Sequence, residues 1–276
     1  MTRNFLGIER LRSSGTNGTW VLPVTPRLTT ASRFLFGGAA LAGAVVAMEE
    51  MSGRQVAWST AQYLDYAMVD EEVEFDVSLD VVGNQITQAS VTGHVGDRVI
   101  VRAVGALGRR NFAHRHVFSG SPNVPRPDDL RRSSLLPHVA RTIHDEFDQR
   151  YVIGRSLEDR DGSVSDGRTL MWVRIIDSDD NADSTTLAMF GDFVPLGVGQ
   201  ALGVLGGGNS LDNTLRIVQL VPTKWVLVDI MIHAVERGFG HGSLKMYAED
   251  GSLLAVASQT CIARLWKDRK WSEETA

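Results

Sequence analysis

Residues 39–47 form an unbroken apolar run, Ala-Ala-Leu-Ala-Gly-Ala-Val-Val-Ala. A helix on a protein surface carries a polar face, so a helix that is apolar on every side must be covered all round. The segments that follow are rich in β-branched residues and are separated by turn-forming pairs such as Gly83-Asn84 and Gly96-Asp97. Such pairs join antiparallel strands. We therefore predict a central helix over residues 38–50, wrapped by antiparallel strands at residues 18–25, 55–67, 73–82, 86–95 and 98–107.

The same order of elements returns in the second half at a constant spacing. Phe36-Gly37 and Phe190-Gly191 stand 154 positions apart (190 − 36). The same offset relates the turn at residues 96–97 to the turn at residues 250–251. A spacing that stays constant through the loops favours a duplicated unit. The predicted fold class is α+β, with two tandem units that each wrap an antiparallel sheet around a central helix. The second unit has its helix at residues 192–202 and its strands at residues 146–157, 168–176, 210–219, 225–235, 240–248 and 253–264.

A basic, proline-containing segment without sustained periodicity separates the two units, which is typical of a linker. The predicted organisation is an N-terminal unit over residues 1–108, a linker over residues 109–144 and a C-terminal unit over residues 145–276. His114 and His116 lie in the linker without acidic or cysteine neighbours, so no metal site is predicted. Residues 206–208, which are all glycine, are expected to form a flexible turn before a strand.

Composition excludes several classes of protein. A net charge of −5 and a pI near 5.8 leave no basic surface for nucleic acid. The apolar run at residues 34–48 is shorter than the roughly 20 residues that a bilayer requires, so no membrane span is predicted. Cys261 is the single cysteine, which excludes an intrachain disulfide and indicates a reducing, cytoplasmic location. No cofactor is predicted.

Asp192 places one carboxylate inside an otherwise apolar run at residues 187–205. Burying an ionised Asp without partners is expensive, so this residue caps the helix, pairs with another group or takes part in chemistry. A helix cap is the simpler interpretation. Chemistry is favoured because the counterpart of Asp192 in the first unit, 154 positions earlier, is Gly38.

Five short motifs keep their order and spacing along the chain: Phe36-Gly37-Gly38, Gly191-Asp192-Phe193, Ser210-Leu211-Asp212, Arg237-Gly238 and Asp250-Gly251-Ser-Leu-Leu-Ala-Val-Ala-Ser-Gln259. Through them, residues 35 to 264 resemble the type II acyl-CoA thioesterases. A central helix wrapped by a curved antiparallel sheet is the hotdog architecture, and the resemblance implies a double hotdog that hydrolyses an acyl-CoA substrate. Double hotdogs associate through their sheet edges, so a homo-oligomer is expected.

The resemblance also implies a site. In that family an Asp at the start of the second helix, a Ser or Thr that opens the following strand and a Gln on the last strand hold the hydrolytic water. These roles fall on Asp192, Ser210 and Gln259. At the offset of 154 their counterparts are, in order, Gly38, Val56 and Gly105. The asymmetry favours one hydrolytic site per chain, with direct attack by water and no covalent intermediate.

Thioester hydrolysis also needs donors aimed at the oxygen on which negative charge develops. Gly38 and Ala39 suit this requirement, because backbone N–H groups at the start of a helix are unpaired and aligned with the helix dipole. The sequence departs from the family pattern at Ala39, where Gln is usual, at Asn213, where His is usual, and at Val221-Pro222, where an Arg-Pro pair is frequent. Such flanking positions shape the acyl and pantetheine channel and bear on substrate range.

Two other functions remain open for this sequence. A hotdog dehydratase or hydratase would need a histidine paired with an acid near the central helix. Neither predicted helix contains a histidine, although His233 or His241 could approach from a strand. A hotdog module that binds acyl groups without turnover is the third reading, and a thiol-release assay with a panel of acyl-CoAs separates it from a hydrolase.

Overall fold

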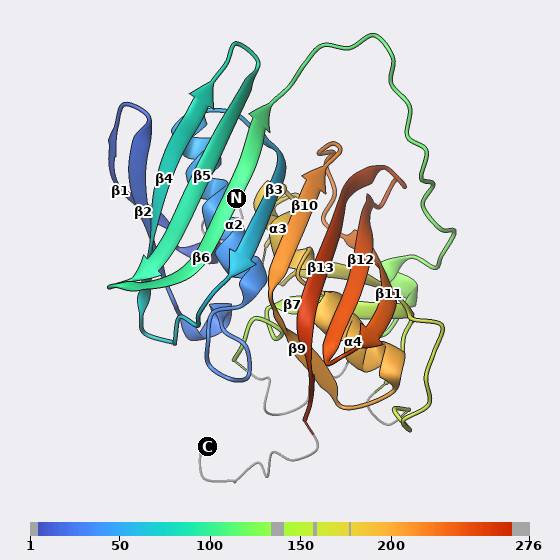
Figure 1. The fold of residues 1–276 in the computed structure, drawn as a ribbon. Coiled ribbons are helices and arrows are strands. Elements are labelled where there is room, and N and C mark those ends of the chain that lie inside the picture. Colours follow the sequence, from blue (N-terminus) through green and yellow to red (C-terminus); the bar gives the residue numbers. More distant parts are fainter. Residues whose placement is uncertain (1–4, 134–140, 157–158, 177, 267–276) are drawn as a thin grey trace.

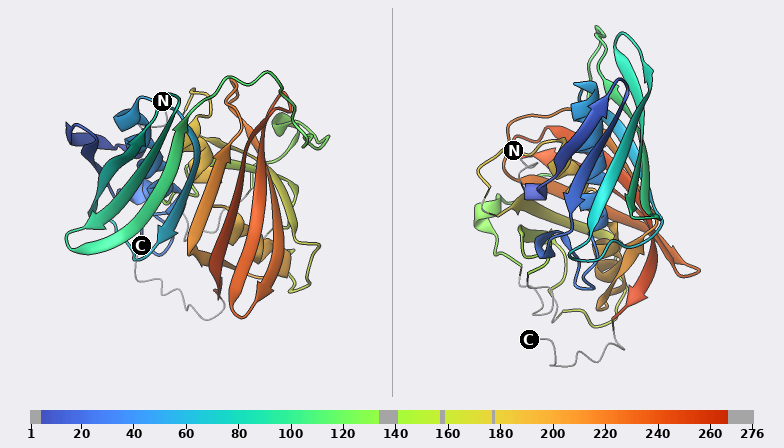
Figure 2. Two further views of the ribbon diagram at one scale, coloured as in Figure 1. Left: turned by 45° about the horizontal axis from the view of Figure 1, so that its top comes forward. Right: turned by 90° about the vertical axis from the view of Figure 1, so that its left-hand side faces the viewer.

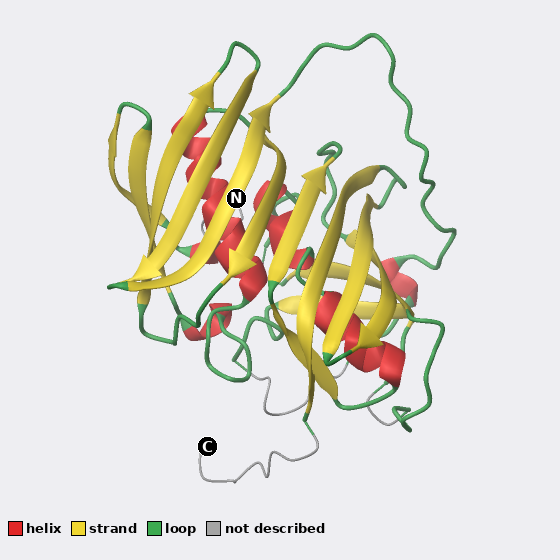
Figure 3. Ribbon diagram, viewed as in Figure 1, coloured by secondary structure: helices red, strands yellow, loops and turns green. Residues whose placement is uncertain are grey.

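The computed structural model describes residues 5–133, 141–156, 159–176 and 178–266. In this part of the chain one continuous sheet of 13 strands curves around the helices, which lie on one side of it (Figures 1 to 3). The N-terminal half consists of β1 (Glu9–Ser14), β2 (Asn17–Pro23), α2 (Gly37–Ser52), β3 (Val56–Tyr63), β4 (Glu72–Val82), β5 (Ile86–Val95) and β6 (Arg98–Gly108). The C-terminal half consists of β7 (Phe147–Ile153), β8 (Arg168–Ile175), α3 (Ser184–Phe190), α4 (Val194–Leu202), β9 (Gly206–Ser210), β10 (Asp212–Ile217), β11 (Val226–Glu236), β12 (Phe239–Ala248) and β13 (Leu253–Leu265).

Helix α2 is the buried central helix that its apolar run predicts. Its side chains are buried from Ala39 to Met48, and it contacts β2 to β6. The sheet approaches closely where the helix carries glycine: a Cβ added at Gly43 would lie 2.9 Å from the Phe75 ring. The helix ends at Gly53, whose left-handed φ of 64° suits glycine. The expectation of a helix wrapped by antiparallel strands is confirmed.

The second unit differs from the expected single helix at residues 192–202. Two short helices, α3 and α4, occupy this region, and Asp192 lies in the turn between them rather than at a helix start. The additional helix α3 begins with a capping box, in which the Asp183 side chain accepts from the Thr186 amide at 2.9 Å. Pro195 stands in the first turn of α4. The capping box therefore starts an additional helix before the apolar run, and the turn at Gly191-Asp192-Phe193 separates it from α4.

The two halves meet where β3 pairs with β10, in the sheet order β1-β2-β4-β5-β6-β3-β10-β13-β12-β11-β8-β7, with β9 also paired to β13. Thr60 stands opposite Thr214, exactly one repeat of 154 residues later, and the two hydroxyl oxygens are 2.6 Å apart. Equivalent residues face each other only where a local two-fold axis passes between them. The duplicated units are therefore related by an approximate two-fold axis through this strand pair.

Two further elements depart from expectation. The glycines at 206–208 form β9, which pairs with β13, and not a flexible turn. Between β6 and β7 the described residues hold only one short 3-10 helix, η2 (Pro127–Asp129). This segment arcs over the C-terminal half in Figure 1 and is fastened there, since the Trp172 indole donates to the carbonyl of Pro125 at 2.9 Å. The division into two units and a linker stays a prediction.

The wrapped helix generates a stability prediction. Leu41 of α2 is fully buried, and Leu41→Ala should lower the free energy of unfolding by about 2–5 kcal/mol, because it removes buried methyl groups and leaves a cavity. Val81→Ala is the matched control on β4, at a side chain that is 58% exposed, and should change that free energy by less than about 1 kcal/mol. Urea unfolding measures both, and equal effects would contradict a core centred on α2.

Candidate active site

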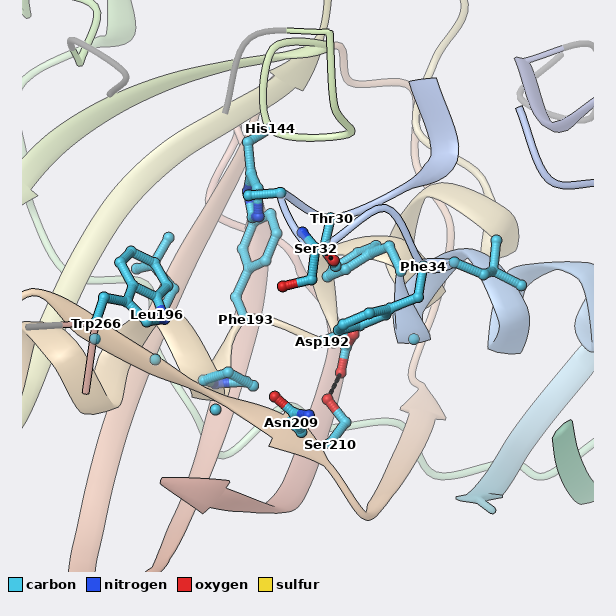
Figure 4. A pocket seen from close by; sticks show the side chains of 18 of the residues that line it. Thr30, Ser32, Phe34, His144, Asp192, Phe193, Leu196, Asn209, Ser210 and Trp266 are labelled. Carbon is cyan, nitrogen blue, oxygen red and sulfur yellow. Dashed lines mark hydrogen bonds between the residues drawn. The ribbon is translucent and has the colours of Figure 1, made fainter. Parts of the chain in front are cut away.

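The three candidate side chains come together from three elements. Asp192 lies in the α3–α4 turn and Ser210 ends β9 (Figure 4), and Gln259 lies on β13. Strand β13 pairs with β10 up to Ser258 and with β9 from Cys261, so Gln259 lies where the sheet passes from one partner to the other. Asp192 and Gln259 are each only 3% exposed. The fold thus carries three residues that are far apart in sequence to one buried point.

The carboxylate of Asp192 accepts three hydrogen bonds, from donors in both halves of the chain. Ser210 Oγ donates to Oδ1 at 2.8 Å, and Gln259 Nε2 also donates to Oδ1. Gln259 Nε2 lies 2.7 Å from Ser210 Oγ as well, which fixes the two side chains against each other. The backbone N–H of Gly38 donates to Oδ2 at 2.7 Å. The Asp192 carboxylate therefore links the start of α2 to the second unit.

Burial raises the pKa of Asp192 to about 6, although the hydrogen bonds from Ser210, Gln259 and Gly38 act in the opposite direction. Desolvation penalises the charged form, and the three donors compensate only part of that penalty. A carboxyl group with a pKa near 6 is ionised at neutral pH and can still take up a proton during a reaction. This combination is typical of a general base.

The amides expected to stabilise the developing oxyanion are engaged in this structure. Gly38 donates to Asp192, and the Ala39 amide donates to the carbonyl of Phe36 at 2.9 Å. Within the described residues, the Gly37 amide at the first position of α2 has no hydrogen-bond acceptor, and Gly37 lines the pocket beside Asp192. The roles of Gly38 and Ala39 as oxyanion donors stay a prediction, and the structure adds Gly37 as a free donor.

Tyr63 is a site residue that the sequence analysis missed. Its hydroxyl donates to the carbonyl of Gly37 at 2.9 Å, which orients the first peptide of α2. Burial, and then the charge of Asp192, raise the pKa of Tyr63 well above its ordinary value, so the hydroxyl stays protonated and continues to donate. The residue at the repeat offset is Ile217, and no motif surrounds Tyr63. Only the fold identifies it.

A pocket of about 250 Å³ opens beside Asp192 and is lined by residues of both halves. Asp192 and Ser210 line one part of it and His144 lines another (Figure 4). Gly37 and Tyr63 also line the pocket. No group of three or more His, Cys, Asp or Glu residues among those described is placed to hold a metal ion. Within the same residues, no helix is long and apolar enough to cross a membrane.

Comparisons with solved structures show that the chain has the hotdog fold. A candidate thioesterase from Novosphingobium aromaticivorans is 29% identical, with a TM-score of 0.80, and the match covers 92% of this chain and 97% of that one. An acyl-CoA thioesterase II from Mycobacterium marinum is 19% identical, with a TM-score of 0.73 and coverage of 96% and 98%. A hotdog-fold protein from Alicyclobacillus acidocaldarius is 18% identical, with a TM-score of 0.75 and coverage of 92% and 95%.

A family model makes the assignment specific. The model of the acyl-CoA thioesterase C-terminal domain matches residues 119–263, more than half of the chain, so the chain belongs to this family of thioester hydrolases. No curated protein matched the sequence. The resemblance to type II acyl-CoA thioesterases and the double hotdog fold are confirmed.

The raised pKa of Asp192 predicts a specific dependence of stability on pH. The group titrates near 3.8 when unfolded and near 6 when folded, so its stabilising contribution is complete below about pH 4 and is lost as the pH rises through 6. Asn does not titrate. The free energy of unfolding of Asp192→Asn, relative to the unmodified protein, should therefore rise by roughly 2–3 kcal/mol between about pH 4 and pH 7. Urea unfolding at the two pH values measures this, and a difference that stays constant would contradict the shift.

Proposed function

We propose that this chain hydrolyses an acyl-CoA thioester to a free acid and CoA, by direct attack of a water molecule that Asp192, Ser210 and Gln259 hold. The convergence of these three side chains on one buried carboxylate beside a pocket carries the proposal. Oδ1 already accepts two donors, whereas Oδ2 accepts the Gly38 amide and keeps one lone pair for the water.

The proposed reaction has two steps. Asp192 takes one proton from the water as its oxygen attacks the carbonyl carbon, and the carbonyl electron pair moves to the oxygen, giving a tetrahedral oxyanion. The oxyanion then collapses, the carbon–sulfur bond breaks, and the proton held by Asp192 passes to the departing CoA sulfur. No covalent enzyme intermediate forms, and Asp192 returns to its ionised state.

Stabilisation of the oxyanion is assigned to the start of α2. The Gly37 amide is free in the described structure and stands at the positive end of a 16-residue helix. The Tyr63 hydroxyl donates to the Gly37 carbonyl, which belongs to the same peptide as the Gly38 N–H, so it holds the peptide that follows the free Gly37 amide. The Gly38 and Ala39 amides, which donate here to Asp192 and to the carbonyl of Phe36, stay predicted oxyanion donors beside Gly37. A fixed donor needs no rearrangement when the charge forms.

The alternative functions receive less support from the geometry. His233 and His241 are exposed, where they contact Ser243 and Thr260. His144 lines the pocket, but within the described residues it makes no hydrogen bond to an acid. Among the described residues that line this pocket, no histidine pairs with an acid as a dehydratase or hydratase would need, and the His94–Asp76 pair at 3.0 Å lies elsewhere, on β5 and β4. Release of thiol from a panel of acyl-CoAs separates hydrolysis from acyl binding without turnover.

We also propose a cellular location and an oligomeric state for the protein. We place the protein in the cytoplasm, because it has a single, buried cysteine. A homo-oligomer formed through sheet edges is the proposed assembly, and β1 and β7 are the two ends of the strand order.

The catalytic assignment predicts a large effect of Asp192→Asn. The substitution keeps the size of the side chain and removes its ability to take a proton, so turnover of the best acyl-CoA should fall by roughly 10²- to 10⁴-fold, or about 3–5 kcal/mol of barrier. The Km for that substrate should change little. Initial rates of thiol release measure both quantities, and an unchanged rate in the folded variant would remove Asp192 from the mechanism.

Ser210→Ala and Gln259→Ala should each lower turnover by less than Asp192→Asn does. Combining either with Asp192→Asn should cause little further loss, because all three side chains position the same water. Thiol-release rates for the single and double variants, with circular dichroism as a folding control, test this. Fully multiplicative effects would show that the three residues act separately.

The pKa of Asp192 also predicts the pH profile of the reaction. The ionised carboxylate is the active form, so kcat/KM should fall about tenfold per pH unit below about 6 and reach a plateau above it. Asp192→Asn should remove this acidic limb from any residual activity. Rates measured with a substrate that does not titrate in this range provide the test, and an acidic limb that persists in the variant would assign it to another group.

A further inference from the structure

The wall of the pocket contains buried hydrogen-bond donors that have no partner within the described structure. Gln149 lines the pocket, is 4% exposed, and its Nε2 is unpaired. Arg160 lines the same pocket, is partly buried, and its Nε is also unpaired. An unpaired buried donor costs free energy in the empty protein. Two such donors in the wall of one pocket therefore indicate a ligand that supplies acceptors.

The fold places these donors together on one side of the pocket. Gln149 and Tyr151 are two residues apart on β7, so their side chains lie on the same face of the strand, and both line the pocket. Tyr151 and Arg160 lie close enough that each affects the other's pKa, and the Tyr151 hydroxyl stays protonated because burial raises its pKa. No carboxylate of the described residues forms an ion pair with Arg160, whose only polar contact is a 3.4 Å hydrogen bond to the carbonyl of Val204. The guanidinium charge is available to a ligand.

The position of Gln149 relates these donors to the reacting centre. Phe147 lies two residues earlier on β7, about 7 Å along the strand. Its ring packs edge-on against that of Phe193 at 5.8 Å, and Phe193 follows Asp192 directly. Gln149 therefore lies one strand step beyond the aromatic contact beside Asp192. Asp192, Gln149 and Arg160 line one pocket, so an acyl chain whose carbonyl lies at Asp192 can extend toward these donors.

We propose that the donors of Gln149 and Arg160 bind an oxygen-bearing group on the acyl chain of the substrate, most favourably a terminal carboxylate. This inference rests on the proposed thioesterase function and specifies its substrate class. Both donors present N–H groups, and the cation of Arg160 favours an anionic acceptor. His144, which contacts the Phe36 ring in the same pocket, is neutral near pH 7 because burial lowers its pKa to about 4. It therefore adds no competing charge.

The test compares pairs of acyl-CoAs that have equal numbers of carbon atoms, one ending in methyl and the other in carboxylate, at several chain lengths. The unmodified protein should favour the carboxylate member of its best pair by roughly 10- to 100-fold in kcat/KM. Gln149→Leu and Arg160→Met should remove most of this preference and leave hydrolysis of the methyl member nearly unchanged. Gln149→Glu, which replaces the donor by a negative charge, should reverse the preference.

Two controls keep the outcome specific. Arg155 also lines the pocket, but its guanidinium already donates to the carbonyl of Ser163, so Arg155→Met should leave the preference unchanged. Gln149→Leu removes an unpaired buried donor, so its melting temperature should equal or exceed that of the unmodified protein. A lowered melting temperature would show that Gln149 has a structural partner and would overturn the proposal.

The remaining outcomes separate this inference from the proposed function. Hydrolysis without a carboxylate preference, or with a preference that survives both substitutions, overturns the inference and leaves the thioesterase assignment intact. An equal loss for both members of a pair, absent when the same acyl groups are carried on N-acetylcysteamine, assigns the donors to the pantetheine arm and also overturns it. If no thioester in the panel is hydrolysed, the proposed function itself fails.

Discussion

The hydrogen bond between the Gly38 amide and the Asp192 carboxylate joins the two halves of the chain at the point where the chemistry is proposed. An ionised carboxylate that is 97% buried needs several donors, because desolvation costs several kcal/mol and each charged hydrogen bond returns about 1.5–3 kcal/mol. The donors come from both units, so the carboxylate is satisfied only after the units have docked. The close approach of the start of α2 to the α3–α4 turn also requires glycine. A Cβ at Gly37 would lie 2.7 Å from Asp192 Oδ2, and one at Gly38 would lie 2.6 Å from the carbonyl oxygen of Met189.

The repeat of 154 residues explains why there is one such point and not two. The axis that brings Thr60 opposite Thr214 also brings Gly38 to Asp192, since both pairs are one repeat apart. In the first unit the residue equivalent to Asp192 is Gly38, which has no carboxylate. The residue equivalent to Gln259 is Gly105 on β6, where an added Cβ would lie 3.2 Å from the sulfur of Met48. The first unit thus fills with apolar packing the space that the second unit gives to polar groups, and it supplies only backbone donors.

Much of this fold follows from local patterns in the sequence, and each element that the prediction missed was missed for a physical reason. The strand at residues 86–95 was predicted to the residue, because turn-forming pairs mark both of its ends. Helix α3 was missed because its first turn is polar and lies before the apolar run, and β9 was missed because three glycines have little intrinsic preference for a strand. The convergence at Asp192 came from family motifs. The engagement of the Gly38 and Ala39 amides and the role of Tyr63 depend on contacts between elements, which no sequence window contains.

Unpaired polar atoms concentrate around the candidate site. Within the described residues, the buried side-chain atoms without a partner include both amide atoms of Asn213, Gln259 Oε1, Gln149 Nε2 and Arg160 Nε. Asn213 and Gln259 are neighbours across the β10–β13 pair, because Thr214 stands opposite Ser258. Gln259 turns its Nε2 to Asp192, which leaves its Oε1 without a donor. Such groups lower the stability of the free protein, and they persist where binding uses them. The other unpaired buried atoms of the described residues, on Thr25, Thr169 and Arg174, lie outside the pocket lining, so the larger share of the set lies at the candidate site, as the proposed binding of a substrate there would require.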